Sequence, residues 1–409
     1  MKWLKIISIS FVLLLSGCNE VSEPNDLAYV VAIGIDEAEQ ENIYEITLQI
    51  ANPLAISGGS KEEGGEGGEK TISEITVTAP TIFSAVNVVN HLNSKKISLS
   101  HTALIAFCDE IAKEGMKEFA DTIGRSEELR PNTYISVVRG SAKEYLSSIK
   151  PTNEVNPVQY YRMIYGAGYT GFIPKSTSQE FYIASVCSCR DIVLPLSAVK
   201  EEDSAANEII YDGFEYLAEN YIAGEVEAES EEKTQSYGMA IISDGKMIAE
   251  ASAIEAEMFN MLTGRYTQSV VTYKNKKTPD RPVTVKQSQQ RKPKVRVKIV
   301  DGKPQIYVKI YMDADLSTVS GEYLIEEEFD DFESQATEEI KAAVDKFLEK
   351  TAAEYKSDII GFGDYAKRSF KTYNEFMEYG WLEKYPESEF ITEVEFHIRR
   401  SGLVDRKRG

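Results

Sequence analysis

The stretch Leu-Ala-Tyr-Val-Val-Ala-Ile-Gly-Ile-Asp, residues 27–36, predicts the first strand of the fold. It is a short and nearly continuous apolar run, which is typical of a buried strand. Residues 43–52 alternate between apolar and polar side chains as a half-buried strand does, and residues 81–92 place apolar side chains at helical spacing. Strand-like sequence returns at residues 99–107. Alternating strands and helices indicate a mixed α/β layer structure.

The rest of the chain continues this alternation in at least two units. A turn at Asp244-Gly245 predicts one β-hairpin, and a turn at Asp301-Gly302 predicts another. The last third combines a hairpin with a long helix and a returning strand, so we expect it to form a separate α+β unit. Helices are predicted at residues 110–123, 142–149, 254–262 and 333–356, and strands at 134–139, 183–186, 237–242, 247–249 and 390–398.

Length and charge limit the classes of protein to which the chain can belong. Its 409 residues include 45 Lys and Arg against 66 Asp and Glu, a formal net charge of −21. This balance would repel phosphate, which argues against nucleic acid as the main partner. A chain of this length typically folds as two or three domains. The only long apolar run lies at the extreme N-terminus, which excludes a polytopic membrane protein.

No catalytic motif stands out in the sequence. His91, His101 and His397 are the only histidines, and none has a Cys, Asp or Glu partner at a recognisable motif spacing. A Gly-x-Ser-x-Gly elbow, a phosphate-binding loop and a paired-histidine zinc motif are all absent. A catalytic triad assembled from distant residues stays open on spacing alone. We expect a protein that is not an enzyme and uses neither a metal nor another cofactor, with His101 as a structural residue in an apolar strand.

The first eighteen residues predict export and a lipid anchor. Lys2 and Lys5 flank the start of an apolar run at residues 6–15, which is too short to span a bilayer. The run leads into Ser16-Gly17-Cys18, which is similar to a lipobox, where bacteria diacylate the cysteine and cleave before it. Two acyl chains are enough for stable anchoring without a transmembrane helix. The alternative is an ordinary signal peptide in which Cys18 is incidental.

Three cysteines remain once Cys18 is assigned to the anchor. An odd number in an exported protein does not support a full disulfide framework. Cys187 and Cys189 could form half of a metal site, but no second pair of ligands follows at zinc-site spacing. We therefore expect Cys108, Cys187 and Cys189 to be buried free thiols, the last two on one face of a strand. Residues 57–70 are rich in Gly and Glu, and we expect them to form a mobile loop.

A cationic segment interrupts this acidic chain. Residues 274–309 contain twelve basic side chains against Asp280 and Asp301. Lys294, Arg296 and Lys298 alternate with apolar residues, so one face of the second hairpin is expected to be cationic and exposed. These three residues are the candidate partner contact, either for anionic lipid headgroups or for an acidic partner. Internal charge complementarity and solubility are the alternative interpretation.

Several short motifs occur in a recognisable order along the chain. They are Cys18, Asn25-Asp26-Leu27-Ala28, Gly34-Ile35-Asp36, Leu99-Ser100-His101, Gly124-Arg125-Ser126, Glu128-Leu129-Arg130-Pro131, Tyr355-Lys356-Ser357-Asp358-Ile359-Ile360-Gly361-Phe362-Gly363 and Ile398-Arg399-Arg400-Ser401-Gly402-Leu403. Together they resemble the C subunit of spore germinant receptors, the Ger(x)C lipoprotein family, from the lipobox almost to the C-terminus. The chain departs from the family pattern at Asn19-Glu20, after the lipid cysteine, and at Leu99-Ser100, before the histidine.

The resemblance implies an α+β fold of three mixed domains, each a central β-sheet flanked by helices. After a signal peptide at residues 1–17, we expect an N-terminal domain at 18–198, a middle domain at 199–270 and a C-terminal domain at 271–409. The resemblance also implies a non-enzymatic lipoprotein on the outer face of the spore inner membrane. Its partners would be the integral membrane A and B subunits of a receptor that triggers germination in response to nutrients. A solute-binding lipoprotein of a transporter is the alternative.

The resemblance also singles out residues with structural roles. We expect Asp26, Arg125 and Arg130 to form buried or half-buried ion pairs. Gly361 and Gly363 are expected to permit a turn that inserts an aromatic ring into the sheet. The last strand would end in two arginines that point to opposite faces. The motif residues assigned to the fold are Asp26, His101, Arg125, Arg130, Gly361, Gly363, Arg399 and Arg400.

Overall fold

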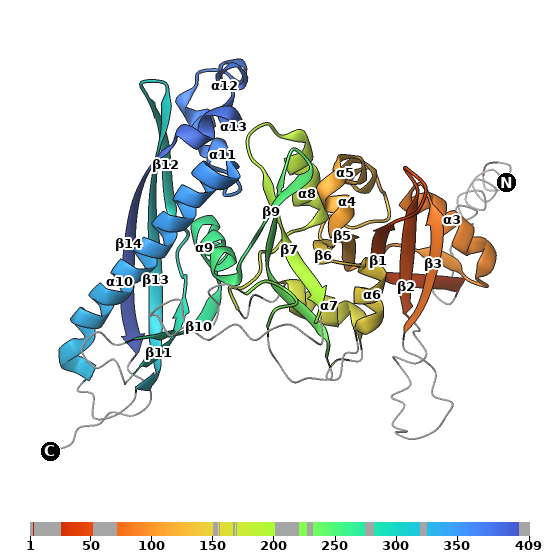
Figure 1. Cartoon of the computed structure of the whole chain (residues 1–409), viewed down its shortest axis with the longest axis horizontal. Coiled ribbons are helices and arrows are strands. Elements are labelled where there is room, and N and C mark those ends of the chain that lie inside the picture. The colour runs from red at the N-terminus through yellow and green to blue at the C-terminus, as the bar shows by residue number, and fades with distance from the viewer. Residues whose placement is uncertain are drawn as a thin grey trace.

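The computed structural model describes residue 3 and residues 26–51, 72–149, 154, 156–166, 168, 170–200, 221–226, 232–274, 282–319 and 325–400. Cys18 with its signal peptide and the Gly/Glu-rich segment 57–70 lie outside these residues. The described strands form two sheets, one of nine strands and one of five, and helices pack against both (Figure 1). This arrangement confirms the α+β class.

The nine-stranded sheet has a parallel centre and antiparallel edges. β1, β5, β6 and β7 run parallel, and their central residues are buried on both faces, as is usual for apolar runs in parallel sheets. The strand order is β3-β2-β1-β5-β6-β7-β8-β9, and the short β4 pairs with the first residues of β1. The strands are β1 (Leu27–Glu37), β2 (Tyr44–Ala51), β3 (Ile72–Ala79), β4 (Lys96–Ser98), β5 (Leu104–Cys108), β6 (Tyr134–Arg139), β7 (Ile192–Val199), β8 (Thr234–Ser243) and β9 (Lys246–Ala251).

Helices cover both faces of this sheet. On one face, Ile82, Phe119 and Phe181 of three different helices belong to one buried cluster with the strands. On the other face, Leu146 and Tyr161 pack in a second, smaller cluster. The helices around this sheet are α3 (Ile82–Leu92), α4 (Asp109–Glu114), α5 (Lys117–Gly124), α6 (Ala142–Ser148), α7 (Pro157–Gly166) and α8 (Ser178–Val186).

The five-stranded sheet is built around one long strand, β13 (Lys303–Val319). β12 (Lys294–Val300) and β11 (Val283–Ser288) pair with successive parts of β13, and β10 (Gln268–Tyr273) pairs with β11. β14 (Glu389–Arg400) runs parallel to β13 along its other edge. The helical elements of this half are α9 (Ala253–Thr263), α10 (Ile325–Lys350), a π-helical turn (Thr351–Tyr355), α11 (Phe362–Ala366), a 3-10 turn (Lys367–Ser369), α12 (Tyr373–Tyr379), α13 (Trp381–Lys384) and a second 3-10 turn (Tyr385–Glu387).

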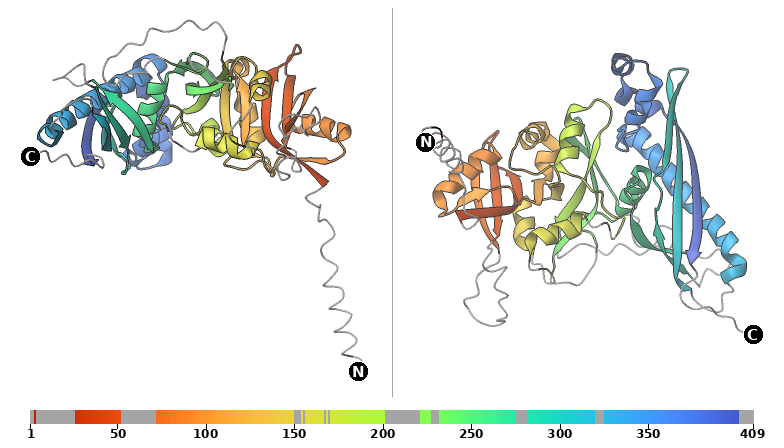
Figure 2. Two further views of the ribbon diagram at one scale, coloured as in Figure 1. Left: turned by 90° about the horizontal axis from the view of Figure 1, so that it is seen from below. Right: turned by 180° about the vertical axis from the view of Figure 1, so that it is seen from behind.

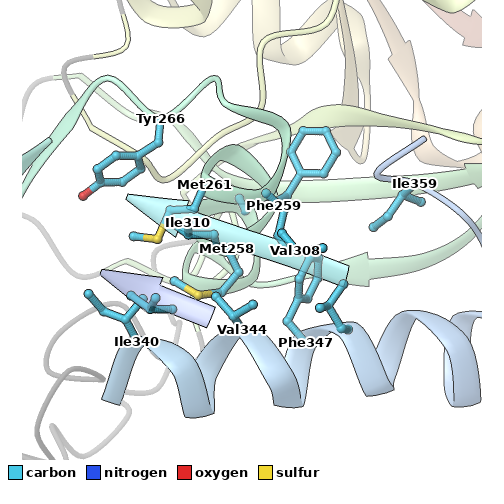
Figure 3. Packing of buried hydrophobic residues seen from close by; sticks show 14 of the residues in the cluster. Met258, Phe259, Met261, Tyr266, Val308, Ile310, Ile340, Val344, Phe347 and Ile359 are labelled. Carbon is cyan, nitrogen blue, oxygen red and sulfur yellow. The ribbon is translucent and has the colours of Figure 1, made fainter. Parts of the chain in front are cut away.

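One hydrophobic core joins the two sheets. Met258 and Phe259 of α9 pack in one buried cluster with Ile310 of β13 (Figure 3). Ile241 of β8 belongs to the same cluster. α10 contributes Val344 and its neighbours to this cluster. α9 lies between the sheets, while α3 and the five-stranded sheet lie at opposite ends of the molecule (Figures 1 and 2).

Several expected elements have the expected bounds, and others differ for identifiable reasons. The strand at 134–139 and both hairpins form as expected. The helix expected at 110–123 is interrupted at Gly115, whose φ of 145° is incompatible with a helix, and is therefore two helices. Residues 183–186, expected as a strand, are the end of α8, which starts with a capping box between Thr177 and Glu180.

The expected middle domain, residues 199–270, has no sheet of its own in the described part of the chain. β8 and β9 complete the nine-stranded sheet, and β10 begins the five-stranded one. The three proposed domain boundaries stay a prediction.

Within the described ranges, no helix is both long enough and apolar enough to cross a bilayer.

Candidate docking surface

The second hairpin presents the predicted cationic residues on the outer face of the five-stranded sheet. Asp301 and Gly302 both have positive φ values, 50° and 81°, as a tight two-residue hairpin turn requires. Along β12, Val297 is buried toward the core, whereas Lys294 and Lys298 lie on the opposite, exposed face. The alternation predicted from the sequence is therefore present.

Lys294, Arg296 and Lys298, here called the cationic stripe, form no ion pair with any carboxylate in the described ranges. The Lys294 ammonium instead lies over the ring of Tyr311, 5.4 Å from its centroid. Arg291 lies 5.6 Å from the same ring. Unpaired cations on an exposed strand are available to an incoming anionic group.

The acidic side chains of this sheet lie on the far strand. Lys309, on β13, separates the cationic stripe from Glu393 and Glu395 of β14 and bonds to both, at 3.3 and 2.6 Å. Hydrogen bonding to Glu395 and Glu393 raises the pKa of Lys309 above its usual value. The outer face is thus cationic along β12 and acidic along β14. Next to Tyr311 it is hollowed by about 250 Å³, between Arg291, Glu395 and His397.

The free edge of β12 is partly covered. The hydroxyl of Ser369, in the 3-10 turn after α11, donates a hydrogen bond to the carbonyl of Val297 at 3.1 Å. Lysines on an edge strand also discourage pairing with another chain. The cationic stripe therefore has a second physical role, which is to keep the free edge of β12 from pairing with a strand of another chain. This role is independent of any partner bound to the outer face of the sheet.

The longest sequence motif, residues 355–363, folds around one buried carboxylate. Asp358 is fully buried and accepts hydrogen bonds from the backbone N–H groups of Gly361 (2.9 Å), Phe362 (3.0 Å) and Gly363 (2.7 Å). The indole N–H of Trp381 donates a fourth, at 2.8 Å. Burial raises the pKa of Asp358 to about 6, and these hydrogen bonds oppose the rise.

Both glycines of this motif are required by its geometry. Gly361 has a φ of 84°, and a Cβ on Gly363 would lie 2.0 Å from the carbonyl oxygen of Cys189. The turn places the Phe362 ring fully inside the core, stacked near Tyr385. The expected insertion of an aromatic ring is therefore present. The motif also connects to the nine-stranded sheet, because the Asp191 N–H donates to the Asp358 carbonyl at 3.0 Å.

Sequence comparisons cover both halves of this arrangement. Residues 20–199 match the family described as "Spore germination protein N-terminal domain", and residues 237–402 match "Spore germination B3/ GerAC like, C-terminal". The chain belongs to the Ger(x)C family. It is 25% identical to spore germination protein KC of Bacillus subtilis (strain 168) over 98% of this chain and 96% of the relative. It is 23% identical to spore germination protein B3 of the same organism, over 99% of this chain and 100% of that one.

A solved structure of the family has the same fold. The crystal structure of the GerBC protein matches with a TM-score of 0.54 at 15% sequence identity, over 90% of this chain and 96% of that chain.

A second Ger(x)C motif, Gly34-Ile35-Asp36, positions a helix. Asp36, at the end of β1, accepts hydrogen bonds from the backbone N–H groups of Ala142 (2.6 Å) and Lys143 (2.9 Å) at the start of α6. Burial raises the pKa of this carboxyl. Gly34 allows the close packing, because a Cβ there would lie 3.1 Å from the Leu146 side chain.

The expected ion pairs of Asp26, Arg125 and Arg130 are not buried, and that prediction was wrong. All three residues are exposed. Arg125 bonds to Asp121 one turn earlier on the same helix, at 2.8 Å, rather than to a distant partner. Arg130 contributes its backbone carbonyl, which accepts a hydrogen bond from the Ser178 hydroxyl at 2.9 Å.

The remaining motif residues also lie at the surface. His101 sits in the turn before β5 rather than in a strand, with its ring edge-on to Tyr29. Partial burial, together with Arg130, lowers the pKa of His101. Arg399 bonds to Asp313 on the neighbouring strand at 2.8 Å, and Arg400 is exposed as well.

The cysteines differ from the expectation of three free thiols. Cys187 and Cys189 form a disulfide, and only Cys108 is a free buried thiol, with its pKa raised by burial to about 12. Asp364 lies close to both disulfide sulfurs. Sulfurs bonded to each other are not thiolates, so this trio has no metal-binding chemistry in the oxidised state.

Three buried carboxyl groups were not identified from the sequence. Asp358 had a local signal, since an Asp shortly before a Gly often hydrogen-bonds the backbone ahead of it. Asp191 accepts a hydrogen bond from Ser357 at 2.7 Å, which links residues far apart in the chain. Glu257 is 1% exposed on α9 and accepts from the Tyr266 hydroxyl at 3.1 Å. No local pattern marks either of the last two.

Proposed function

We propose that this chain is a non-enzymatic, lipid-anchored subunit of a spore nutrient germinant receptor. Membership of the Ger(x)C family, with relatives named as spore germination proteins along nearly the whole chain, supports the receptor role. The lipobox at Cys18 supports a diacylglycerol anchor on the outer face of the spore inner membrane. In this proposal the chain acts beside the integral membrane A and B subunits of the receptor.

The contribution of the subunit is docking rather than nutrient binding. The cationic stripe carries this part of the proposal, because it is exposed, unpaired by any described carboxylate, and set in a chain with a net charge of −21. Its partner is an acidic surface, since an electrostatic interface gains association rate and specificity from opposite charges. The acidic β14 on the same sheet face would repel a partner bound in the wrong register.

The test is a charge reversal of the stripe in spores. Lys294→Glu, Arg296→Glu and Lys298→Glu together change the local charge by six units, and exposed substitutions usually cost little stability. Spores with this variant should hold normal amounts of the protein, germinate slowly with nutrients, and germinate normally by a route that bypasses the receptor.

A matched control separates the effect of charge at the cationic stripe from the effect of the net charge of the protein. Lys175→Glu, Lys246→Glu and Lys371→Glu change the net charge equally at three scattered exposed positions. This control should germinate like the wild type. Normal nutrient germination of the stripe variant at wild-type abundance would show that the outer face is merely solvated. Calorimetric binding of an amino acid or sugar to the isolated chain would favour the solute-binding alternative instead.

A further inference from the structure

α3 lies at the end of the molecule opposite β12, the strand that carries the cationic stripe (Figures 1 and 2). Its exposed face holds three large apolar side chains. Val88 and Leu92 are one turn apart on the same side of the helix, and they are 44% and 68% exposed. Phe83, on the other flank of the exposed half, is 42% exposed. The polar residues between these flanks are Ser84, Asn87 and His91.

The sequence segment that contains α3 carries no acidic side chain, although the chain as a whole is acidic. No Asp or Glu occurs from residue 75 to residue 108, although the chain holds 66 of them. Lys95 and Lys96 follow two residues after the end of the helix, and Lys96 is exposed. In the sequence this segment is bounded by Glu74 and Asp109. In the fold, Asp26 lies beside Lys96 through the β1–β4 pairing, and Glu128 accepts the Leu99 N–H at 2.9 Å.

The path of the chain ties this surface to the anchor. β1 begins at Leu27, which pairs directly with Lys96 at the start of β4. Asp26 follows Cys18 by only eight positions. At about 3.5 Å per extended residue, this segment spans at most roughly 30 Å. A lipid on Cys18 would therefore hold the α3 end of the molecule close to the bilayer.

We propose that the α3 end lies against the lipid surface, with Val88 and Leu92 in the headgroup region and Lys95 and Lys96 on anionic headgroups. This proposal rests on the proposed Cys18 anchor. The polar residues of the exposed helix face limit the contact to the interface, as in helices that lie on a membrane rather than enter it. The cationic stripe then lies at the end away from the anchor, so its acidic partner is a protein rather than a lipid headgroup.

The test uses the full lipidated chain in vesicles of phosphatidylglycerol and phosphatidylcholine that contain no other protein. Leu92→Cys receives a fluorescent label, and lipids carrying a nitroxide quench any label at headgroup depth. Val270→Cys is the matched control, because Val270 is 63% exposed and lies on β10 of the other sheet. Cys108 is buried and Cys187 is bonded to Cys189, so the new cysteine takes the label.

We expect the nitroxide lipids to quench the emission of the label at position 92 and to leave the emission of the label at position 270 unchanged. Exchanging Lys95 and Lys96 for Glu should reduce the loss at Leu92 in anionic vesicles. Protein that floats with the vesicles but shows no quenching at Leu92 overturns the proposal and leaves the anchor standing. Equal quenching at both positions overturns it as well, because the chain would then lie flat. Protein that does not float with the vesicles overturns both the anchor and the surface proposed from it.

Discussion

Glu257 should make the stability of this protein depend on pH in the neutral range. The side chain is 1% exposed on α9, in the core shared by the two sheets, with the Tyr266 hydroxyl as a hydrogen-bond donor. Burial raises its pKa to about 7, against an ordinary value of 4.5, and the neighbouring polar side chains, among them the Tyr266 hydroxyl, oppose the rise. The folded chain therefore keeps a proton that the unfolded chain loses.

The sign and size of the effect follow from this difference. Below about pH 4.5 the carboxyl is protonated in both states and costs nothing. As pH rises toward 7, the unfolded state releases its proton first, so the free energy of unfolding falls. At about 1.4 kcal/mol per pKa unit, the loss above pH 7 is about 3 kcal/mol. Asp358 and Asp191, whose pKa values burial also raises, add to the same slope.

The variant Glu257→Gln removes the titration and keeps the shape. Urea unfolding of the chain from residue 19, followed by the fluorescence of its one tryptophan, Trp381, should give similar stabilities for wild type and variant at pH 4.5. At pH 8 the variant should be more stable, by up to about 3 kcal/mol. Glu378→Gln, at an exposed position, is the control and should leave the slope unchanged. Parallel pH profiles for wild type and Glu257→Gln would refute the reasoning.

Three further changes test other parts of the chain. Cys18→Ala should abolish palmitate labelling and release the protein from membranes, and continued labelling of this variant would exclude the anchor. Deletion of residues 58–68 should lower the melting temperature by no more than a few degrees, because halving or doubling a flexible loop changes its closure free energy by only about 0.6 kcal/mol. A larger drop would mean that the loop packs against a domain. Asp358→Asn should lower the free energy of unfolding, measured with urea at pH 7, by about 3 kcal/mol. The reason is that an NH₂ donor replaces one of the two carboxylate oxygens that accept N–H groups. The exposed Asp364→Asn is its control, and equal effects of the two would contradict the role of Asp358.

The sequence predicted an element correctly where the spacing of its apolar side chains and the turn or capping residues at its ends indicated the same structure. The strand at 134–139 and the turn at Asp301-Gly302 have the expected bounds, because alternation and positive-φ turn residues are local signals. The helix at 110–123 failed at Gly115, since the apolar spacing from Ile111 to Phe119 continues across the break. Residues 183–186 differ from the prediction for another reason, because the capping box of Thr177 and Glu180 starts a helix that continues through them.

Only part of the candidate site could be predicted from the sequence. Exposure of the cationic stripe followed from alternation along a single strand. The partners of Asp358 were inaccessible, because Trp381 and Asp191 reach it from distant parts of the chain. The exposure of Arg125 and Arg130 could not be predicted either, because membership of a sequence motif carries no information about burial.

The strand order of the nine-stranded sheet bears on whether the chain can be divided. The first family match ends at residue 199, the last residue of β7, and the second begins at residue 237, within β8. A polypeptide that ends after β7 would leave this strand without its antiparallel neighbour β8. The unpaired backbone N–H and C=O groups of this apolar strand could then pair with strands of other chains. We therefore expect that the two matched regions do not fold as separate units, although the sequence comparisons recognise them separately. Exchange of modules between family members would have to carry β8 and β9 together with the N-terminal region.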